Sequence, residues 1–315
     1  MSNAQDRDQP AIRIGVDLGG TKIESIVLGN DGRVLDRRRT PTPRNDYDTT
    51  IATVAGLVDA VERDLGRTGR VGVGIPGTLS RATGLVKNAN STWLNGRPLD
   101  RDLAAALGRP VRLQNDANCF AVSEAADGAA AGAGVVFGVI LGTGVGAGLV
   151  IDGRPLDGPN GIAGEWGHNP LPWPADDERP GPPCYCGLNG CIETFLSGPG
   201  FAAGYSRETG CEITAATVAE RAAASEPAAV RHLERYVDRL ARGLAHVINI
   251  LDPDVIVLGG GLSNLAVLYE QVPERWQRHV FSDRVDTRLV PPRHGDSSGV
   301  RGAAWLWRPG EVSGP

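Results

Sequence analysis

One histidine and three closely spaced cysteines stand out: His168, Cys184, Cys186 and Cys191. Thiolates this close together, on a glycine-bearing turn and near an imidazole, can wrap a tetrahedral Zn²⁺ as Cys₃His. A disulfide or three unrelated core thiols is the alternative, and it is the weaker one because cysteines two residues apart bridge poorly. We therefore expect a zinc site with two carboxylates fixed beside it, Glu165 and Glu193.

The segment Asp17-Leu18-Gly19-Gly20-Thr21-Lys22 has the composition of a phosphate-binding turn. Its glycines let backbone N–H groups approach a polyphosphate, while the threonine adds a hydroxyl and the lysine a positive charge. The aspartate, at the end of its strand, can orient Mg²⁺ through water. The spacing differs from that of a Walker P-loop, so a different nucleotide-binding turn is expected.

Two further glycine-rich segments strengthen this interpretation. The first, Gly142-Thr143-Gly144 and its continuation to residue 148, nearly repeats the first turn, so two opposed turns could hold the phosphates of one nucleotide. The second, Gly259-Gly260-Gly261, follows an apolar strand and suits the close approach of adenosine. Plain packing of a helix on a strand is the alternative for this triple glycine.

Asn115 and Asp116 follow a short strand, at the carboxyl edge where open α/β sheets bind ligands. A carboxylate there could accept the proton of an attacking hydroxyl, as the catalytic aspartate of other phosphoryl-transfer enzymes does. The same aspartate could instead cap the helix expected from Ala117. These residues alone leave both interpretations open. Asn90 likewise offers an amide to a polyol or shapes its loop.

The elements that must position these residues alternate along the chain. Strands are expected at residues 12–18, 24–29, 71–75, 111–113, 135–141, 149–151 and 255–258, and helices at 49–65, 101–107, 117–131, 265–280 and along a periodic apolar face between 230 and 251. A strand, a glycine-rich turn and a return strand occur twice, which predicts two related lobes that each open with a β-hairpin. The alternation predicts an α/β fold with a mostly parallel sheet in each lobe.

Length and charge indicate a protein that acts on a small molecule. The 315 residues exceed a usual single core, so two lobes are expected. The net charge of −5 comes with interspersed acids and bases and without a basic stripe, and no apolar run is long enough for a membrane span. We expect neither a nucleic-acid nor a membrane partner. Residues 1–10 lack the apolar segment of a signal peptide, which predicts a cytoplasmic location.

Together, segments 17–22, 115–116, 142–148, 164–168 and 184–193 resemble the ROK family of bacterial sugar kinases, over essentially the whole chain. The resemblance implies a two-domain, actin-like fold of the hexokinase (RNase H-like) kind, with ATP and Mg²⁺ in the interlobe cleft. It implies an N-terminal lobe of residues 1–117, on which a final helix of about 298–315 packs. The C-terminal lobe, 118–297, would carry the zinc-binding loop, and the protein would form a homodimer or homotetramer.

Carried over position by position, the resemblance assigns roles to individual residues. Asp116 becomes the general base. The sugar ligands become Asn90, Asn115, Glu165, His168 and Glu193. The nucleotide-binding residues become Asp17, Gly19, Gly20, Thr21, Lys22, Gly142, Thr143, Gly144, Gly259, Gly260 and Gly261. The zinc positions are matched by His168, Cys184, Cys186 and Cys191.

The strings at 86–96, 168–173 and 294–302 look most like the fructokinase and manno(fructo)kinase branch of the family. We therefore predict an ATP-dependent fructokinase that phosphorylates the C6 hydroxyl, with mannose as a further substrate. A ROK kinase for glucose or an N-acetylhexosamine is the alternative. A ROK sugar-responsive repressor is disfavoured, because only residues 1–11 precede the first strand and leave no room for a DNA-binding segment.

Overall fold

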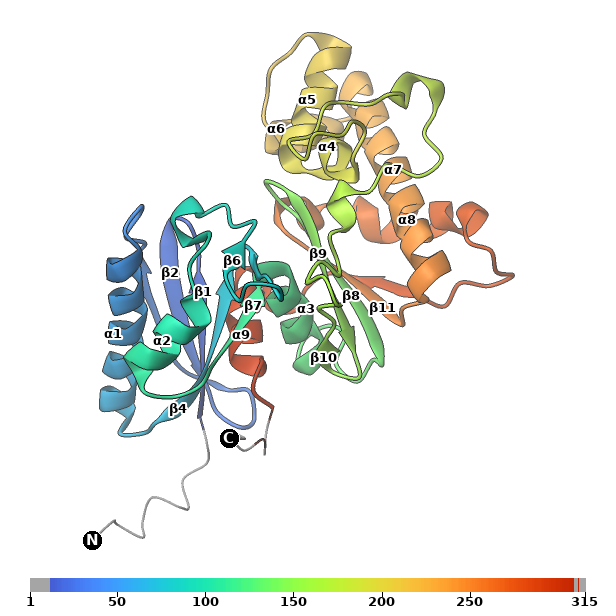
Figure 1. The fold of residues 1–315 in the computed structure, drawn as a ribbon. Coiled ribbons are helices and arrows are strands. Elements are labelled where there is room, and N and C mark those ends of the chain that lie inside the picture. The colour runs from blue at the N-terminus through green and yellow to red at the C-terminus, as the bar shows by residue number, and fades with distance from the viewer. Residues whose placement is uncertain (1–11, 309–310, 312–315) are drawn as a thin grey trace, which may run out of the picture. The chain divides into compact units, whose positions relative to one another are not determined.

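The computed structural model describes residues 12–308 and residue 311, which form two compact units (Figure 1). Unit 1 holds the described residues up to Asp127, the segment Asp157–Ile162 and the described residues from Asp296 onward. Unit 2 holds Gly128–Leu156 and Ala163–Gly295. The lobe boundaries given above stay a prediction. The predicted last helix ends at Trp305 rather than continuing through 306–308, and residues 309–310 and 312–315 lie outside the described residues.

Unit 1 is built on a five-stranded sheet in the order β3-β2-β1-β4-β7. β2 pairs antiparallel with both β1 and β3, whereas β1, β4 and β7 run parallel to one another. A two-stranded ribbon of β5 and β6 is separate from this sheet. The strands are β1 (Ile12–Leu18), β2 (Lys22–Leu28), β3 (Val34–Pro41), β4 (Gly69–Ile75), β5 (Thr78–Leu79), β6 (Val86–Lys87) and β7 (Val111–Asn115).

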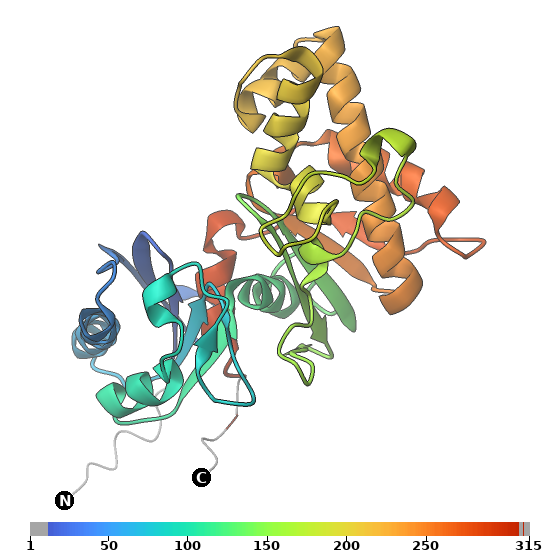
Figure 2. The same cartoon turned by 45° about the horizontal axis from the view of Figure 1, so that its top comes forward.

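Helices cover both faces of this sheet (Figures 1 and 2). Alternate residues of β1, such as Ile14 and Val16, share one apolar core with Val54 and Val58 of the first helix, because successive side chains of a strand point to opposite faces. The other face packs against the last helix. The helices are α1 (Tyr47–Leu65) and α2 (Leu99–Leu107) on the first face, and α3 (Asp116–Ala126) and α9 (Ser298–Trp305) on the second.

Helix α9 meets the sheet and α3 through bare backbone. A Cβ on Gly15 of β1 would lie 2.1 Å from the carbonyl oxygen of Val300, and a Cβ on Gly302 would lie 1.6 Å from that of Cys119. Heavy atoms cannot approach this closely, so only glycine fits at these positions. The missing side chains let α9 hold α3 against the sheet.

Unit 2 repeats this plan, with a sheet in the order β10-β9-β8-β11-β12. β8 pairs antiparallel with β9 and parallel with β11, as β1 does with β2 and β4. The predicted α/β repeat, with a β-hairpin opening each half, is therefore confirmed. The strands are β8 (Val135–Leu141), β9 (Val145–Ile151), β10 (Arg154–Pro155), β11 (Val255–Gly259) and β12 (Arg288–Val290).

The long helix α7 organises the core of unit 2. Its apolar residues recur every three or four positions, and Val237, Leu240, Leu244 and Ile248 are buried, as the periodic pattern predicted. The helices are α4 (Ile192–Leu196), α5 (Gly198–Thr209), α6 (Ala215–Ala223), α7 (Pro227–Leu251) and α8 (Val267–Trp276). Within the described residues, none of the helices combines the length and the apolar character needed to cross a membrane.

Three local expectations were wrong. The glycine-rich turn was placed at 142–148, but β9 begins at Val145, because Gly146 and Gly148 complete the ladder with β8. Helix α3 ends at Ala126 rather than at residue 131, with Asp127 as its C-cap. Helices α5 and α6 were not predicted, since α5 opens with Gly-Pro-Gly. This start is nevertheless helical because the Ser197 hydroxyl accepts from the N–H of Gly200.

The glycine contacts of α9 make a stability prediction. Gly302→Ala would force a methyl group against the backbone of α3, so we expect it to lower the free energy of unfolding by about 2–4 kcal/mol. Gly56→Ala in α1 is the matched control, because a Cβ there meets no atom within 4 Å. It should raise the free energy of unfolding by about 0.5–1 kcal/mol. Urea titrations measure both, and equal values for the two variants would contradict the packing described.

Candidate functional site

In unit 1, functional groups gather where β1, β4 and β7 end. In the sheet register Asp17 lies opposite Gly74, which lies opposite Gln114. A Cβ on Gly74 would sit only 3.3 Å from the sulfur of Cys119. The absence of a side chain at Gly74 therefore leaves room for groups from β1 and α3 to meet above β4.

The electrostatic surroundings of Asp17 favour its protonated form. Burial, and next the negative charge of Asp116, raise the pKa of Asp17 to about 6. Burial also raises the pKa of the Cys119 thiol, with smaller contributions from the same two carboxylates. The two predicted carboxylates, Asp17 and Asp116, are thus brought close enough to interact, in a region that would favour a cation.

Asp116 was interpreted either as a general base or as the cap of α3, and the observed cap distinguishes between the two. The N-cap is Asn115, whose Oδ1 accepts from the N–H of Ala117 at 2.9 Å. Asp116 is the first residue of the helix, is exposed, and its Oδ1 also accepts from Ala117. Capping therefore falls mainly to Asn115, and Asp116 keeps a carboxylate at the helix N-terminus, where negative charge is favoured.

Asn90 lies beside the same strand ends. Its backbone N–H donates to the carbonyl of Pro76 at 3.2 Å, and the Asn115 amide donates to the carbonyl of Gly77 at 3.3 Å. The Asn95 side chain accepts from and donates to the backbone of Ala89, which fixes the loop. Asn90 and Asn115 thus flank one turn, Pro76–Gly77.

The turn between β1 and β2 is fixed by hydrogen bonds from the loop after β3. The Thr42 hydroxyl donates to the carbonyl of Gly19, and Arg44 donates to the carbonyl of Gly20 and to the hydroxyl of Thr21. Lys22 is half-exposed, with its Nζ 3.6 Å from the carboxylate of Glu24. The turn residues therefore present one surface to solvent while their carbonyl groups are held by β3 and the loop after it.

In unit 2, the two predicted glycine segments meet. A Cβ on Gly260 would lie 2.5 Å from the carbonyl oxygen of Leu141, so the end of β11 touches the end of β8 directly. A cavity of about 740 Å³ opens beside them. It is lined by Leu141, Gly142, Thr143, Gly198, Pro199, Ala202, Thr214, Ala215, Ala216, Ala219, Gly261, Leu262 and Leu265. Small apolar residues and bare backbone suit a flat, aromatic group.

Glu193 belongs to α4 and contacts the turn between β8 and β9. Its Oε2 accepts from the N–H of Val145 at 2.8 Å, and a Cβ on Gly144 would sit 2.7 Å from that oxygen. The carboxylate is thus fixed at the second residue of α4. It lies two residues after Cys191, so one short element positions a carboxylate and a thiol.

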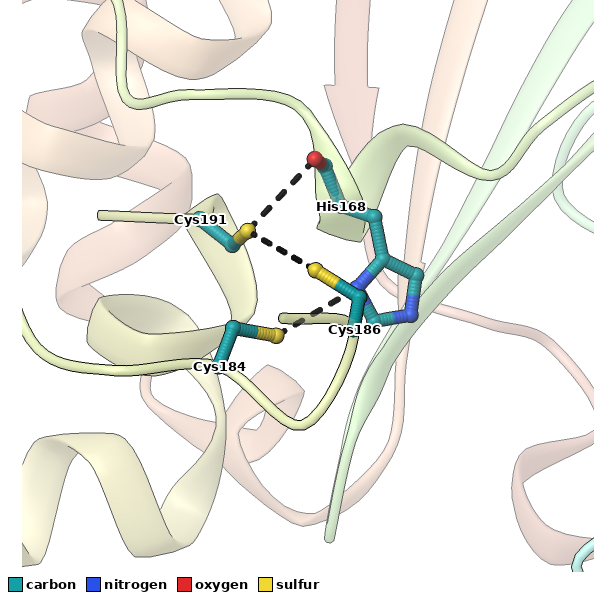
Figure 3. Close-up of side chains that lie close together, drawn as sticks. All are labelled: His168, Cys184, Cys186 and Cys191. Atoms are coloured by element: carbon teal, nitrogen blue, oxygen red, sulfur yellow. Dashed lines mark hydrogen bonds between the residues drawn. The ribbon is translucent and has the colours of Figure 1, made fainter. Parts of the chain in front are cut away.

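The predicted metal-binding residues come together (Figure 3). Their four donor atoms all lie within 4.8 Å of one another. The Cys184 sulfur lies 3.5 Å from Nδ1 of His168, and the sulfurs of Cys186 and Cys191 are 3.6 Å apart. With metal–ligand bonds of about 2.3 Å, the ligand atoms of a tetrahedral site would lie about 3.8 Å apart. The arrangement therefore fits a tetrahedral Cys₃His metal site.

Close backbone contacts hold the histidine side of this cluster. A Cβ on Gly164 would lie 2.1 Å from the carbonyl oxygen of Ala147, and one on Gly167 would lie 2.0 Å from that of Val145. The segment that carries Glu165 and His168 therefore lies directly on β9. Further along, the Arg242 guanidinium donates to the carbonyls of Pro172 and Trp173 and to Glu178, which ties the following loop to α7.

Tyr185, between two of the cysteines, was not singled out from the sequence. Its hydroxyl lies 2.8 Å from Nε2 of His168, and the two rings meet edge to face. Loss of water around the hydroxyl and the nearby charges of Glu193 and Glu165 raise the pKa of Tyr185 to about 12. The Tyr185 hydroxyl therefore contacts the imidazole of His168 and stays protonated at neutral pH.

Gln114 was also missed. Its Nε2 donates to Asp157 at 2.6 Å, while its Oε1 accepts from the N–H of Asn115 and from the Asn118 amide. The segment Asp157–Ile162 is also bound by Lys87, which donates to the carbonyl of Asn160. No sequence motif marks this pairing, because the partners are 43 residues apart.

The raised pKa of Asp17 makes a prediction about pH. A raised pKa means that the folded protein favours the protonated carboxyl, so this stabilising effect is complete below about pH 4 and is lost as the pH rises through about 6. A difference of about two in the pKa corresponds to at most about 3 kcal/mol. Asp17→Asn should therefore stabilise the protein at about pH 8, relative to wild type, far more than at about pH 4.

Urea titrations at both pH values, without divalent cations, test this expectation. Asp59→Asn on the exposed face of α1 is the matched control for the loss of one carboxylate. A constant effect of Asp17→Asn across the range would show that Asp17 is not destabilised by its surroundings.

Comparison with known proteins agrees with this architecture. The profile of the ROK family matches residues 13–309. The chain is 43% identical over 296 residues to an N-acetyl-D-glucosamine kinase of Photobacterium profundum, covering 93% of this chain and 98% of the relative.

Two solved structures extend the comparison. A ROK hexokinase from Thermus thermophilus has a TM-score of 0.83 at 32% identity, covering 94% of this chain and 97% of that one. A ROK family glucokinase from Streptomyces griseus, solved with glucose and AMPPNP, has a TM-score of 0.74 at 27% identity, covering 94% and 99%. The predicted hexokinase-type α/β fold is confirmed.

The prediction of a fructokinase is wrong. Relatives that are 43% identical over 93% of the chain are named N-acetyl-D-glucosamine kinases. The strings that suggested fructose supply amides and an imidazole, such as those of Asn90 and His168, and these can bind hydroxyl groups that all hexoses carry. These strings therefore indicate that the substrate is a hexose, but they do not distinguish one hexose from another. With a family profile spanning residues 13–309 and relatives at this identity, the chain belongs to the ROK family.

Proposed function

We propose that this protein is an ATP-dependent kinase that phosphorylates the C6 hydroxyl of N-acetyl-D-glucosamine. The identity of 43% to kinases named for that sugar, over 93% of the chain, is the single observation that carries the choice of substrate. The residues at the strand ends of both units support the reaction.

The adenine ring of ATP binds in the 740 Å³ cavity of unit 2. Its walls are small side chains and glycine backbone, so a flat base can lie against Gly261 and the start of α6. The turn Gly142-Thr143-Gly144 borders the same cavity and offers its backbone and hydroxyl to the phosphates. The β1–β2 turn of unit 1, with Gly19, Gly20, Thr21 and Lys22, provides the second phosphate-binding surface.

Asp17 would hold a magnesium ion, which would supply positive charge to the phosphoryl groups. A bound cation would also offset burial and the like charge of Asp116, the two main causes of the raised pKa of Asp17.

Asp116 acts as the general base. Its carboxylate accepts the proton of the C6 hydroxyl as the sugar oxygen forms a bond to the γ-phosphorus, and the bond between that phosphorus and the bridging β,γ-oxygen breaks. The products are ADP, N-acetyl-D-glucosamine 6-phosphate and one proton. Asn115 fixes the first turn of α3 as its cap and thereby orients the base.

The proposed sugar ligands are Asn90 and Asn115 of unit 1 and Glu165, His168 and Glu193 of unit 2. Glu165 and Glu193 accept from sugar hydroxyls, and Asn90 and Asn115 offer amides. His168 offers the nitrogen that faces away from Cys184, which is Nε2. His168, Cys184, Cys186 and Cys191 would hold zinc, which would fix the imidazole and the loop that carries it.

A coupled assay of ADP release tests the proposed function. Purified full-length protein with ATP and Mg²⁺ should give a kcat/KM for N-acetyl-D-glucosamine at least about tenfold above those for glucose, mannose and fructose. Phosphorus NMR of the product should show a 6-phosphate. A higher kcat/KM with another hexose, or no ADP release with any, would contradict the proposal.

The role of Asp116 predicts a second kinetic result. Asp116→Asn should lower kcat by about 10²- to 10⁴-fold, because the proton acceptor is lost, while sugar affinity measured by calorimetry changes little. Asp59→Asn, the exposed aspartate of α1, serves as the control and should keep wild-type turnover. Wild-type kcat in Asp116→Asn would remove Asp116 as the base.

The metal site predicts a difference between two cysteines. Cys191 is buried within the cluster, whereas Cys211 is exposed and lies outside it. Wild type and Cys211→Ser should each hold about one zinc per chain by elemental analysis, and Cys191→Ser far less. Because Cys191→Ser could also weaken folding, chelator titration of wild type provides the second test, with a fall in melting temperature expected. A chain that holds no zinc would contradict the assignment.

A further inference from the structure

Tyr185 combines an exposed ring with an engaged hydroxyl. The residue is 81% exposed, yet its hydroxyl lies 2.8 Å from Nε2 of His168. The ring meets the imidazole edge to face, with centroids 5.0 Å apart. Apart from this contact, the side chain has little packing to hold it.

The His168 ring has a single proton to share when neutral. Its Nδ1 faces the Cys184 sulfur at 3.5 Å. When that nitrogen binds the zinc proposed above, its lone pair is used, so the proton of the neutral ring lies on Nε2. That N–H donates to the hydroxyl oxygen of Tyr185, and one N–H serves one acceptor well.

The same N–H is the one assigned to the sugar. The Tyr185 hydroxyl therefore takes the donor that the proposed function assigns to a hydroxyl of the substrate. Both oxygens cannot take the Nε2 proton at once.

We propose that the Tyr185 hydroxyl occupies the place of a sugar hydroxyl at His168 in the free protein, and that the substrate displaces it. This inference rests on the proposed function, since it assigns His168 to the hexose. Tyr185 thus sets the affinity for sugar through competition and takes no part in phosphoryl transfer.

The loop can release the side chain without moving. Cys184 and Cys186 on either side belong to the metal-binding cluster, and the N–H of Cys184 donates to the carbonyl of Leu188 at 2.8 Å. Gly187 takes a φ of 90°, which closes the turn in a form that fits glycine. Because the backbone is fixed and the ring is exposed, rotation about the side-chain bonds of Tyr185 is sufficient.

The test is calorimetric titration of N-acetyl-D-glucosamine into the zinc-loaded protein without nucleotide. Tyr185→Phe keeps the ring and removes the competing oxygen, so Kd should fall about 2- to 10-fold, the range of one net hydrogen bond. Leu188→Ala is the matched control, since Leu188 lies in the same loop and is 63% exposed. It should leave Kd unchanged. Zinc content should equal that of wild type in both variants.

An unchanged Kd for Tyr185→Phe would overturn the inference. A raised Kd would overturn it too, because the hydroxyl would then be a sugar ligand. A second readout, nitrogen NMR of histidine-labelled protein without sugar, should show a shifted Nε2 resonance of His168 in Tyr185→Phe but not in Leu188→Ala. An unshifted resonance counts against the contact itself.

Failure of this inference and failure of the proposed function give different results. If wild type phosphorylates another hexose and not N-acetyl-D-glucosamine, the proposed substrate is wrong, and the same titration with the accepted hexose decides the role of Tyr185. If N-acetyl-D-glucosamine is the substrate and Tyr185→Phe binds it as wild type does, only the inference is wrong. A chain that binds no hexose would overturn both.

Discussion

Direct contact between backbones, at positions where a Cβ would not fit, is the constraint on which both units depend. In unit 1, Gly302 lets α9 touch α3, the helix that begins with Asp116. In unit 2, Gly164 and Gly167 let one segment lie on β9, and that segment carries Glu165 and His168. Contacts of this kind leave few alternative positions for the chain. Asp116, Glu165 and His168 therefore project from segments that these contacts constrain.

The carboxylates of the candidate site have different electrostatic surroundings from the buried carboxylate Glu178. Glu178 is buried against Arg239 and Arg242, and these hydrogen bonds and charges lower its pKa despite burial. At the edge of unit 1, by contrast, the second influence on Asp17 is the like charge of Asp116. A structural carboxylate is stabilised by its guanidinium partners, whereas two neighbouring carboxylates destabilise each other until a cation binds. This difference is the signature expected of a site that waits for a ligand, since functional sites concentrate perturbed groups.

Local chemistry was readable from the sequence, whereas long-range pairing was not. The approach of His168 and the three cysteines was predicted because the cysteines are close in sequence and thiols near an imidazole favour a metal. The second glycine-rich turn was predicted less well, because it was extended into β9. The link between Gln114 and Asp157 joins distant residues through ordinary amide and carboxylate groups, so no local pattern announces it. The strand character of Gly146 and Gly148 depended on the partner strand β8 rather than on their own weak preference. The substrate was predicted wrongly for a similar reason. Groups that bind any hydroxyl are conspicuous in the sequence, whereas the space around one sugar substituent is set by side chains distant along the chain.

The position between Cys184 and Cys186 shows how a rigid loop can still tune affinity. Its backbone is fixed by neighbours on both sides and by the turn at Gly187, so a change of side chain at Tyr185 leaves the ligand geometry intact. The imidazole of His168 is held through Nδ1, which leaves Nε2 to respond to whatever lies at that position. Under the inference drawn above, any residue there that offers an acceptor would compete with substrate, and any residue that offers none would leave the N–H to the sugar. Affinity would then vary through one exposed side chain, while the Cys₃His cluster, Asp116 and the cavity of unit 2 remain as they are.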